Sequence, residues 1–391
     1  MLNKHHYRYM GEMLIIALLV SGCQAAIAVT STIPESTSSP TGEPTHFEPA
    51  VNPTDSIPVY GPVVYPVNVD PLTGLVVDDP TLLDRCPMLI KVSNYPRSGR
   101  PHAGLSMADL VFDYYIGEGM NRFAAVYYGR DVTKVGPIRS GRLVDAQLAT
   151  LYHGILAFKG AWFKVNEVLD STLKERAISG APSTCPGICD TGSETVISMF
   201  ANTSELEKYS QEKGICGVER PDLTGMVFSE AIPADGRPAM DLAVNFNAYN
   251  RAEWHYDKVS GTYLRWIESI SGEEGKEIIT MVPLTDANTG LQLAFDNVVI
   301  LFAKHDMYAP TYFDIQLQEN NSGARAVLLR DGKAFDGVWK SAGGDKPLQF
   351  LDTEGEYLPF KPGNTWLVIV GSRSTLIGSP DQMWELTNEL P

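Results

Sequence analysis

The sequence predicts an N-terminal α+β (or α/β) domain followed by a mostly-β C-terminal domain, a small barrel or sandwich. Strand-like and helix-like runs interleave between residues 68 and 240, which indicates mixed α and β structure. Between residues 245 and 391, short strand-like runs follow one another without a helical stretch of useful length. The chain of 391 residues is long enough to bury two separate cores.

In the first domain, apolar runs at residues 88–92, 110–116 and 123–128 predict strands. Residues 140–152 carry apolar side chains at helical spacing and predict a helix. The sequence Ser204-Glu205-Leu206-Glu207 fits a capping box, which predicts a second helix that ends at Gly214.

The second domain is expected to consist of hairpins. Residues 254–257 and 262–266 flank a Lys-Val-Ser-Gly turn, and Asp331-Gly332 is a favoured two-residue turn between strands at 324–330 and 333–339. Further strands are predicted at residues 298–303, 313–318, 348–351 and 365–370. The aromatic residues of the first hairpin are more typical of a core face than of a carbohydrate platform; they are Trp254, Tyr256, Tyr263 and Trp266.

Cys23 ends an N-terminal leader. A weakly basic start with Lys4 and Arg8 precedes an apolar run, as in a secretory signal, and Val20-Ser21-Gly22-Cys23 resembles a bacterial lipobox. Two acyl chains on the cysteine give stable membrane anchoring. We therefore expect that residues 1–22 are a lipoprotein signal peptide and that lipidated Cys23 holds the protein on the extracytoplasmic face of the cell membrane. The alternative is an ordinary signal peptide with a chance cysteine.

Residues 23–67 predict a disordered tether. Residues 24–67 include eight prolines and eleven serines or threonines, and such a segment buries too little apolar surface to offset its ordering. Folded domains are expected at residues 68–240 and 245–391.

The formal net charge of −16 argues against a nucleic-acid partner, because nucleic-acid binding depends on phosphate neutralisation by lysine and arginine. No metal and no cofactor are expected, because the histidines lack metal-motif spacing and no nucleotide-binding loop is present.

Four cysteines remain beside Cys23, an even number in an oxidising compartment: Cys86, Cys185, Cys189 and Cys216. They allow three disulfide connectivities, one of which joins Cys185 to Cys189 and leaves Cys86 with Cys216. A zinc site is the alternative, although a single C-x3-C pair is a weak signal for one.

Seven of the sixteen arginines fall between residues 85 and 142: Arg85, Arg97, Arg100, Arg122, Arg130, Arg139 and Arg142. Clustered guanidiniums in an acidic protein suggest bidentate binding of carboxylates or phosphates. The alternative is internal pairing with nearby acids, namely Asp109, Asp113, Glu118, Asp131 and Asp145.

The segment Val135-Gly136-Pro137-Ile138-Arg139-Ser140-Gly141-Arg142 gives the sharpest hypothesis. Gly-Pro predicts a turn, and Ser140 is a suitable N-cap for the following helix. Free N–H groups at the helix start, together with Arg139 and Arg142, would form an anion pocket that Arg122 closes.

These residues resemble the YerB-like bacterial lipoproteins, a family built from two domains of unknown function. The matching stretches are Pro71-Leu72-Thr73-Gly74, residues 100–109, Arg122-Phe123, residues 135–142, Trp254-His255-Tyr256-Asp257, Trp339-Lys340 and residues 362–366. The resemblance implies a lipid anchor and a two-domain layout, and it implies no reaction. It differs at Gly117-Glu118-Gly119, where the carboxylate is shifted by one position, and at Phe112-Asp113, which stands for the family's Tyr-Glu.

The sequence supports two functional hypotheses. In the first, a non-enzymatic lipoprotein binds an anionic cell-wall or envelope ligand, with Arg100, Arg122, Arg139, Ser140, Arg142, Asp113 and Glu118 as candidate site residues. In the second, a cell-wall hydrolase or transferase uses Asp113 or Glu118 as acid or base, with Arg122, Arg139 and Arg142 holding the substrate.

Overall fold

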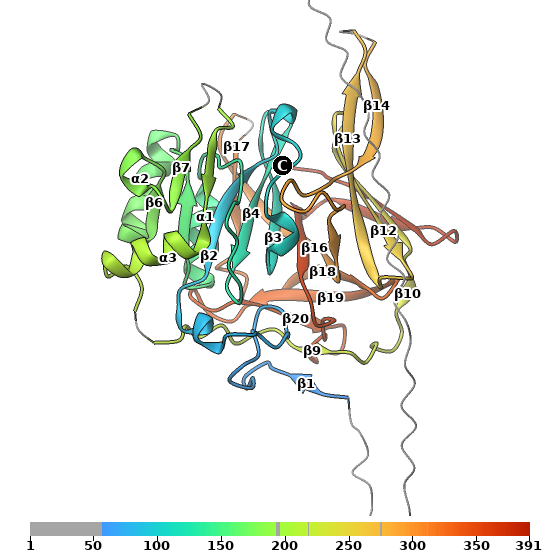
Figure 1. The fold of residues 1–391 in the computed structure, drawn as a ribbon. Coiled ribbons are helices and arrows are strands. Elements are labelled where there is room, and N and C mark those ends of the chain that lie inside the picture. The colour runs from blue at the N-terminus through green and yellow to red at the C-terminus, as the bar shows by residue number, and fades with distance from the viewer. Residues whose placement is uncertain (1–56, 193–195, 218, 274–275, 311) are drawn as a thin grey trace, which may run out of the picture. The chain divides into compact units, whose positions relative to one another are not determined.

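The computed structural model describes residues 57–192, 196–217, 219–273, 276–310 and 312–391, and strands dominate it (Figure 1). The α-helices are α1 (Leu143–Leu151), α2 (Phe163–Leu173) and α3 (Thr203–Glu212). Short 3-10 helices lie at Pro80–Asp84, Arg97–Gly99, Leu105–Met107, Lys174–Arg176 and Pro182–Thr184. The strands are β1 (Val59–Tyr60), β2 (Met88–Ser93), β3 (Leu110–Gly117), β4 (Met120–Tyr127), β5 (Ile155–Phe158), β6 (Ala177–Ser179), β7 (Ile188–Asp190), β8 (Met199–Ala201), β9 (Phe228–Ser229), β10 (Arg237–Pro238), β11 (Asp241–Asn247), β12 (Asn250–Asp257), β13 (Thr262–Ser271), β14 (Ile278–Pro283), β15 (Ala294–Phe295), β16 (Asn297–Ala309), β17 (Tyr312–Gln316), β18 (Ala324–Arg330), β19 (Lys333–Ser341), β20 (Leu348–Asp352), β21 (Thr365–Gly371), β22 (Thr375–Gly378) and β23 (Met383–Thr387).

One large sheet runs through both halves of the chain. Its strand order is β10-β19-β18-β16-β21-β3-β4-β2-β5-β6, with β17 and β20 paired at its side. The junction between the halves is made by β21, which pairs in parallel with β16 on one side and with β3 on the other. The domain boundary at residues 240–245 stays a prediction. Strands from both predicted domains, residues 68–240 and 245–391, belong to this one sheet.

A second sheet has the order β14-β13-β12-β11-β23-β22, with β15 paired to β13. One layer of buried side chains fills the space between the two sheets and includes Phe123, Trp254 and Trp366. The opposite face of the large sheet is covered by α1 and α2, whose apolar side chains join a second layer with Phe112 and Phe158. Side chains along β2, β3 and β4 therefore alternate between the sheet-facing and the helix-facing layer.

The predicted strands and turns largely match the observed ones. The strands expected at residues 88–92, 110–116 and 324–330 correspond to β2, β3 and β18, and the first expected hairpin is β12–β13. Asp331 and Gly332 both have positive φ, as the two-residue turn between β18 and β19 requires. Trp254 and Tyr263 are buried, as a core face requires, whereas Tyr256 and Trp266 are half-buried and Trp266 lies on the opposite face of the hairpin.

Some expectations are not met. The small barrel is not confirmed, because no closed sheet is found in the residues described, and the C-terminal strands divide between the two sheets. The tether was expected to reach residue 67, but β1 pairs with β9, and the Tyr65 hydroxyl donates to the carbonyl of Met226. The folded part therefore includes residues 57–67, and Cys23 lies outside the described residues.

The capping prediction for α3 is also corrected. The N-cap is Asn202, whose side chain accepts a hydrogen bond from the backbone N–H of Glu205 at 3.3 Å, and Ser204 only supports it by donating to Asn202. Gly214, with φ of 63°, follows the end of this helix as predicted.

Candidate anion-binding site

Three of the clustered arginines form ion pairs and have structural roles. Nη1 of Arg85 lies 2.6 Å from Asp131 and 2.8 Å from Glu207. Arg97 and Arg100 both contact Oε1 of the buried Glu268 on β13, at 3.1 and 2.9 Å. Arg100 is therefore held against the second sheet, and the structure does not bring it together with the other candidate arginines.

Arg122, Arg139 and Arg142 form a different group, which we call the arginine cluster. Arg122 is 7% exposed, and its Nη1 donates to the carbonyl of Ser140 at 2.9 Å. Burial, together with the positive charges of Arg142 and Arg139, lowers the pKa of Arg122 to about 9. Burial and the charge of Arg142 likewise lower the pKa of Arg139. The three guanidiniums are therefore close enough to repel one another.

Within the described ranges, the arginine cluster forms no ion pair with a carboxylate. Arg139 donates only to the carbonyl of Val196, at 3.2 Å, and Arg142 to that of Gly141, at 2.9 Å. The Nε atoms of both side chains are buried without a hydrogen-bond partner among these residues. The cluster thus holds positive charge and donor capacity that the described residues do not satisfy.

Ser140 does not cap the helix, and this prediction was wrong. The N-cap of α1 is Arg142, whose backbone N–H donates to the Asp145 carboxylate at 2.7 Å. The preceding segment is extended, because the N–H groups of Arg139 and Gly141 donate to the carbonyls of Lys91 and Gly160. These backbone bonds delay the first helical turn to Leu143 and keep the arginine cluster at the ends of β2 and β5.

A buried polar group lies on the same face of the sheet as Arg122. Lys91 on β2 is 0% exposed, lies 3.2 Å from the Asp145 carboxylate and contacts the hydroxyl of Tyr114. Tyr114 donates to Asp145 as well. Burial, together with the charges of Arg122 and Arg142, lowers the pKa of Lys91 to about 7, although the charge of Asp145 opposes this shift.

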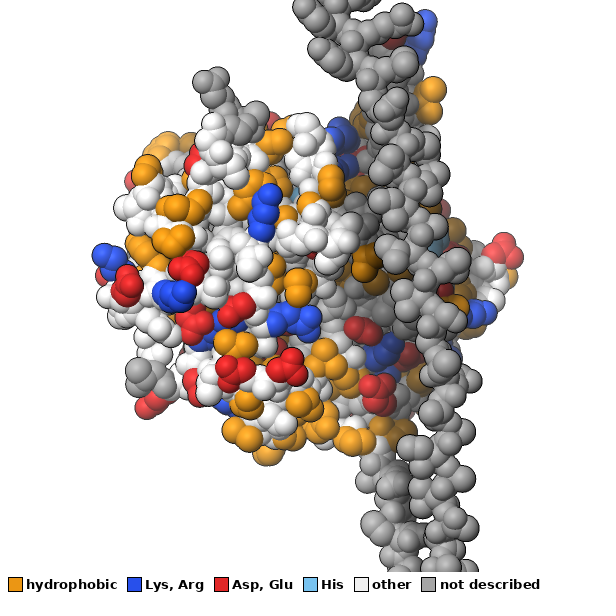
Figure 2. All heavy atoms as spheres, in the orientation of Figure 1, with side chains coloured by type: hydrophobic (Ala, Val, Ile, Leu, Met, Phe, Trp, Pro, Cys, Tyr) orange, Lys and Arg blue, Asp and Glu red, His pale blue; other side chains and the backbone are white. Residues whose placement is uncertain are grey.

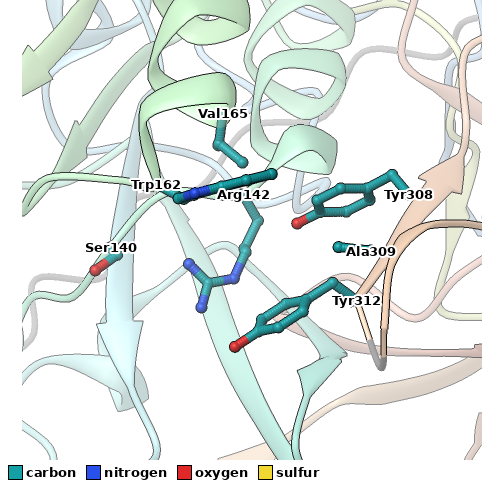
Figure 3. A pocket seen from close by; sticks show the side chains of 7 residues that line it. All are labelled: Ser140, Arg142, Trp162, Val165, Tyr308, Ala309 and Tyr312. Carbon is teal, nitrogen blue, oxygen red and sulfur yellow. The ribbon is translucent and has the colours of Figure 1, made fainter.

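A cavity of about 380 Å³ opens beside the cluster, lined by Ser140, Arg142, Trp162, Val165, Tyr308, Ala309 and Tyr312 (Figure 3). Figure 3 shows the Arg142 side chain reaching into the space between Trp162 and Tyr312. The walls come from the start of α2 and from the β16–β17 hairpin, and the charged floor comes from the segment before α1.

The two candidate carboxylates, Asp113 and Glu118, lie in different parts of the structure. Asp113 is 0% exposed and faces the second sheet, where Trp366 Nε1 donates to it at 3.3 Å and Arg265 lies 3.5 Å away. In the β3–β4 register Asp113 pairs with Phe123 and Tyr114 with Arg122, so Asp113 and Arg122 lie on opposite faces. Burial raises the pKa of Asp113 to about 7.

Glu118 lies near the cavity instead. It is exposed at the turn between β3 and β4, with φ of 52°. Burial raises the pKa of Tyr312, and the hydrogen bond and charge of Glu118 raise it further. Glu118 is therefore placed at the rim of the cavity, whereas Asp113 is excluded from it.

The cysteines lie in the pairs Cys86–Cys216 and Cys185–Cys189, with Cα atoms 5.9 and 4.7 Å apart. These distances suit disulfide bonds and favour one of the three connectivities that the sequence left open.

The sequence analysis missed Lys91 and the aromatic side chains at the cavity. These are Trp162, Tyr308 and Tyr312, with Phe163 in contact with Trp162, and we call them the aromatic wall. Trp162-Phe163 was the available signal, because two adjacent aromatic residues follow a buried strand and precede a helix. On the face seen in Figure 2, acidic and basic side chains are intermixed, so that face offers no extended basic surface. In the part of the chain that the structure describes, no helix combines the length and apolar character needed to cross a membrane.

The N-terminal domain of a protein of unknown function (DUF3048) matches residues 72–216, and the corresponding C-terminal domain matches residues 242–367. The Bacillus subtilis (strain 168) protein YerB, whose name proposes a lipoprotein, is 28% identical over 312 residues, which cover 77% of this chain and 85% of that protein. The crystal structure of YerB from Bacillus subtilis has a TM-score of 0.60 at 25% identity and covers 77% of this chain and 96% of that chain. The resemblance noted in the sequence is confirmed: the chain belongs to the two-domain DUF3048 family of YerB-like proteins.

Proposed function

We propose that this protein is an extracytoplasmic lipoprotein that binds an anionic envelope ligand at the arginine cluster. The observation that carries the proposal is that Arg122, Arg139 and Arg142 repel one another and that none of them forms an ion pair with a carboxylate of the described residues, although the charge of the nearby Asp145 partly offsets the repulsion at Arg122. Burial of the Arg122 charge is unfavourable, and a bound anion would relieve the mutual repulsion of all three guanidiniums.

The surroundings support an anion rather than a cation. Arg142 reaches into the cavity, and Arg122 donates a hydrogen bond to Ser140, which also lines the cavity. Two helices, α1 and α2, begin at the cavity wall. Helix N-termini carry partial positive charge and free N–H groups, which favour negative ligands. Guanidinium groups add planar, bidentate donors for carboxylate or phosphate.

Lipid anchoring rests on a different observation. The leader that ends at Cys23 fits a lipobox, and the relative YerB carries a name that proposes a lipoprotein. Acylation at Cys23 would hold the binding site outside the cell membrane, where anionic envelope components are present.

The enzymatic alternative lacks support from the geometry. In this alternative Asp113 or Glu118 acts as acid or base beside the arginines, but Asp113 faces the other side of the sheet from Arg122. Glu118 alone at the rim does not supply the two carboxylates that glycoside hydrolysis uses.

The test is calorimetric titration of the detergent-solubilised full-length protein with sulfate, comparing the wild type with Arg142→Gln. We expect Arg142→Gln to weaken sulfate binding by about 1.5–3 kcal/mol, the range for hydrogen bonds to charged groups. Thermal stability without sulfate should be unchanged or higher, because the substitution removes repulsion within the cluster.

Arg85→Gln is the matched control, since Arg85 is ion-paired with Asp131 and Glu207 away from the cavity. It should lower the melting temperature and leave the affinity for sulfate intact. Equal sulfate binding by the wild type and Arg142→Gln, or no binding by either, would show that the proposal is wrong.

A further inference from the structure

We propose that the ligand is an acidic saccharide, in which a sugar ring packs on Trp162 and an attached carboxylate or phosphate binds Arg142. This inference rests on the proposed function of the arginine cluster and adds the chemical class of its ligand. The observation behind it is the set of aromatic side chains around the guanidinium.

The aromatic wall is unusually open to solvent. Trp162 is 44% exposed and Phe163 is 61% exposed, although large apolar side chains are normally buried. The rings of Trp162 and Tyr308 are nearly parallel, at 23°, with centroids 6.1 Å apart, and Tyr308 contacts Tyr312 in turn. A continuous aromatic patch beside a charged group is typical of a ligand site rather than of a core.

Sugar rings match this arrangement. One face of a pyranose carries C–H groups that pack against an aromatic ring, while its hydroxyls point outward to polar neighbours. Ser140, Tyr308 and Tyr312 supply hydroxyl groups among the lining residues, and Glu118 adds an acceptor at the rim. In Figure 3 the Arg142 guanidinium extends past the ring of Trp162, where an acidic substituent of the sugar would meet it.

The helix α2 adds a second contact for the acid. Trp162 is its N-cap and provides no side-chain hydrogen bond to the first turn. The leading N–H groups of α2 thus keep their donor capacity, and they begin at the same residue that forms the aromatic wall. Trp162 would therefore place the sugar, and the turn that follows it would help to bind the attached anion.

The same region is poorly suited to an extended peptide, the main competing ligand. Peptides commonly bind by adding a strand to a free sheet edge. Beside the cavity, Gln147 of α1 occupies the edge of β17: its amide donates to the carbonyl of Ile315 at 2.8 Å and accepts from the N–H of Leu317 at 2.8 Å. The cavity volume of about 380 Å³ also lies near the lower end of small-molecule pockets, which favours a terminal sugar over a long chain.

Titration calorimetry on the full-length protein tests this with five probes: glucose 6-phosphate, glucuronic acid, inorganic phosphate, glucose and a glutamate-rich peptide. We expect at least one acidic sugar to bind at least tenfold more tightly than inorganic phosphate and than glucose. The two acidic sugars distinguish a phosphate from a carboxylate as the preferred acid. Trp162→Ala should remove the advantage of the sugar and leave phosphate binding unchanged, whereas Arg142→Gln should weaken both.

Tyr249→Ala is the control for removal of an exposed aromatic residue, because Tyr249 is 50% exposed at the β11–β12 turn. It should change none of the affinities. Phosphate binding that depends on Arg142 without any gain from the sugar, or an unaltered sugar affinity in Trp162→Ala, would overturn the ligand class alone. Failure of phosphate and both acidic sugars to bind would overturn the proposed function with it, and tighter binding of a glutamate-rich peptide would favour the peptide instead.

Discussion

Nη2 of Arg265 lies 3.5 Å from Oδ2 of Asp113, in the layer between the two sheets. Asp113 belongs to the first matched domain and Arg265 to the second. The guanidinium carbon of Arg265 also lies 4.1 Å from the ring centre of Trp254 and 5.0 Å from that of Trp366. One buried cation thus contacts residues of both halves.

Replacing Arg265 by Met should destabilise the fold, and the loss should grow with pH. Burial raises the pKa of Asp113 to about 7, while Arg265 opposes that rise. Because the folded pKa is above the unfolded value, Asp113 favours folding below about pH 4 and loses this contribution as the pH rises through 7. Without Arg265 the buried carboxylate loses its counter-charge and keeps only the hydrogen bonds from Asn121 and Trp366, so the loss at pH 8 should reach about 3–5 kcal/mol, with a smaller loss at pH 5, where Asp113 is protonated.

Urea unfolding of the wild type and of Arg265→Met at pH 5 and pH 8 measures the loss in the free energy of unfolding at each pH. Arg251→Met is the matched control, because Arg251 is exposed on β12, and it should change the free energy of unfolding little at either pH. A loss for Arg265→Met that is the same at both pH values would contradict the role of Asp113.

Sulfate affinity should fall as the pH rises from 6 to 8. The pKa of Lys91 is lowered to about 7, so this side chain loses its proton within that range in the free protein. A dianion near Arg122 and Arg142 favours the protonated lysine, and binding should therefore take up protons. Sulfate keeps its charge throughout, so calorimetry in buffers with different ionisation enthalpies reports proton uptake by the protein. A heat of binding that does not depend on the buffer would contradict this linkage.

The two disulfides should contribute unequally to stability. Cys86–Cys216 spans 130 residues and Cys185–Cys189 only 4, and a longer closed loop removes more entropy from the unfolded chain. Loop-closure estimates give about 5 and about 2 kcal/mol. The double variant Cys86→Ser/Cys216→Ser should therefore melt well below Cys185→Ser/Cys189→Ser. Thiol counting on the denatured, unreduced wild type should find none of these four cysteines free.

Cys23→Ala should release the protein from membranes or block removal of residues 1–22, because acylation of Cys23 is the anchor that we propose. Fractionation of cells that express each form, followed by mass determination of the N-terminus, checks both outcomes. A normally processed variant that remains in the membrane fraction would argue against the lipobox.

Much of the local structure could be predicted from the sequence. Apolar runs located β2, β3 and β18, and Asp331-Gly332 located a hairpin, because these signals depend on neighbours in the chain. The start of α1 was missed, since backbone bonds from Arg139 and Gly141 to distant carbonyls outweigh the capping preference of Ser140. The pairing of β21 with β3 was also out of reach, because nothing local specifies partners so far apart in the sequence.

The site was predicted in part. Arg122, Arg139, Ser140 and Arg142 do lie together, because Arg122, near the start of β4, donates to the carbonyl of Ser140, whose segment passes the ends of β2 and β5. Asp113 was misplaced because a side chain's face depends on strand register, which residue types alone do not define. Roles in ligand binding stay predictions for all of these residues.

The position of β21 has a consequence for biosynthesis. This strand begins at Thr365, far along the chain from the end of β3 at Gly117, yet β21 lies between β16 and β3 inside the large sheet. Chains emerge from the ribosome N-terminus first, so one edge of β3 stays without its partner until residues 118–364 and β21 itself have been made. Unpaired edges invite aggregation, and pairings between distant segments form slowly. The order of synthesis is thus not the order of assembly, and any fragment that ends before residue 365 leaves the sheet split at this strand.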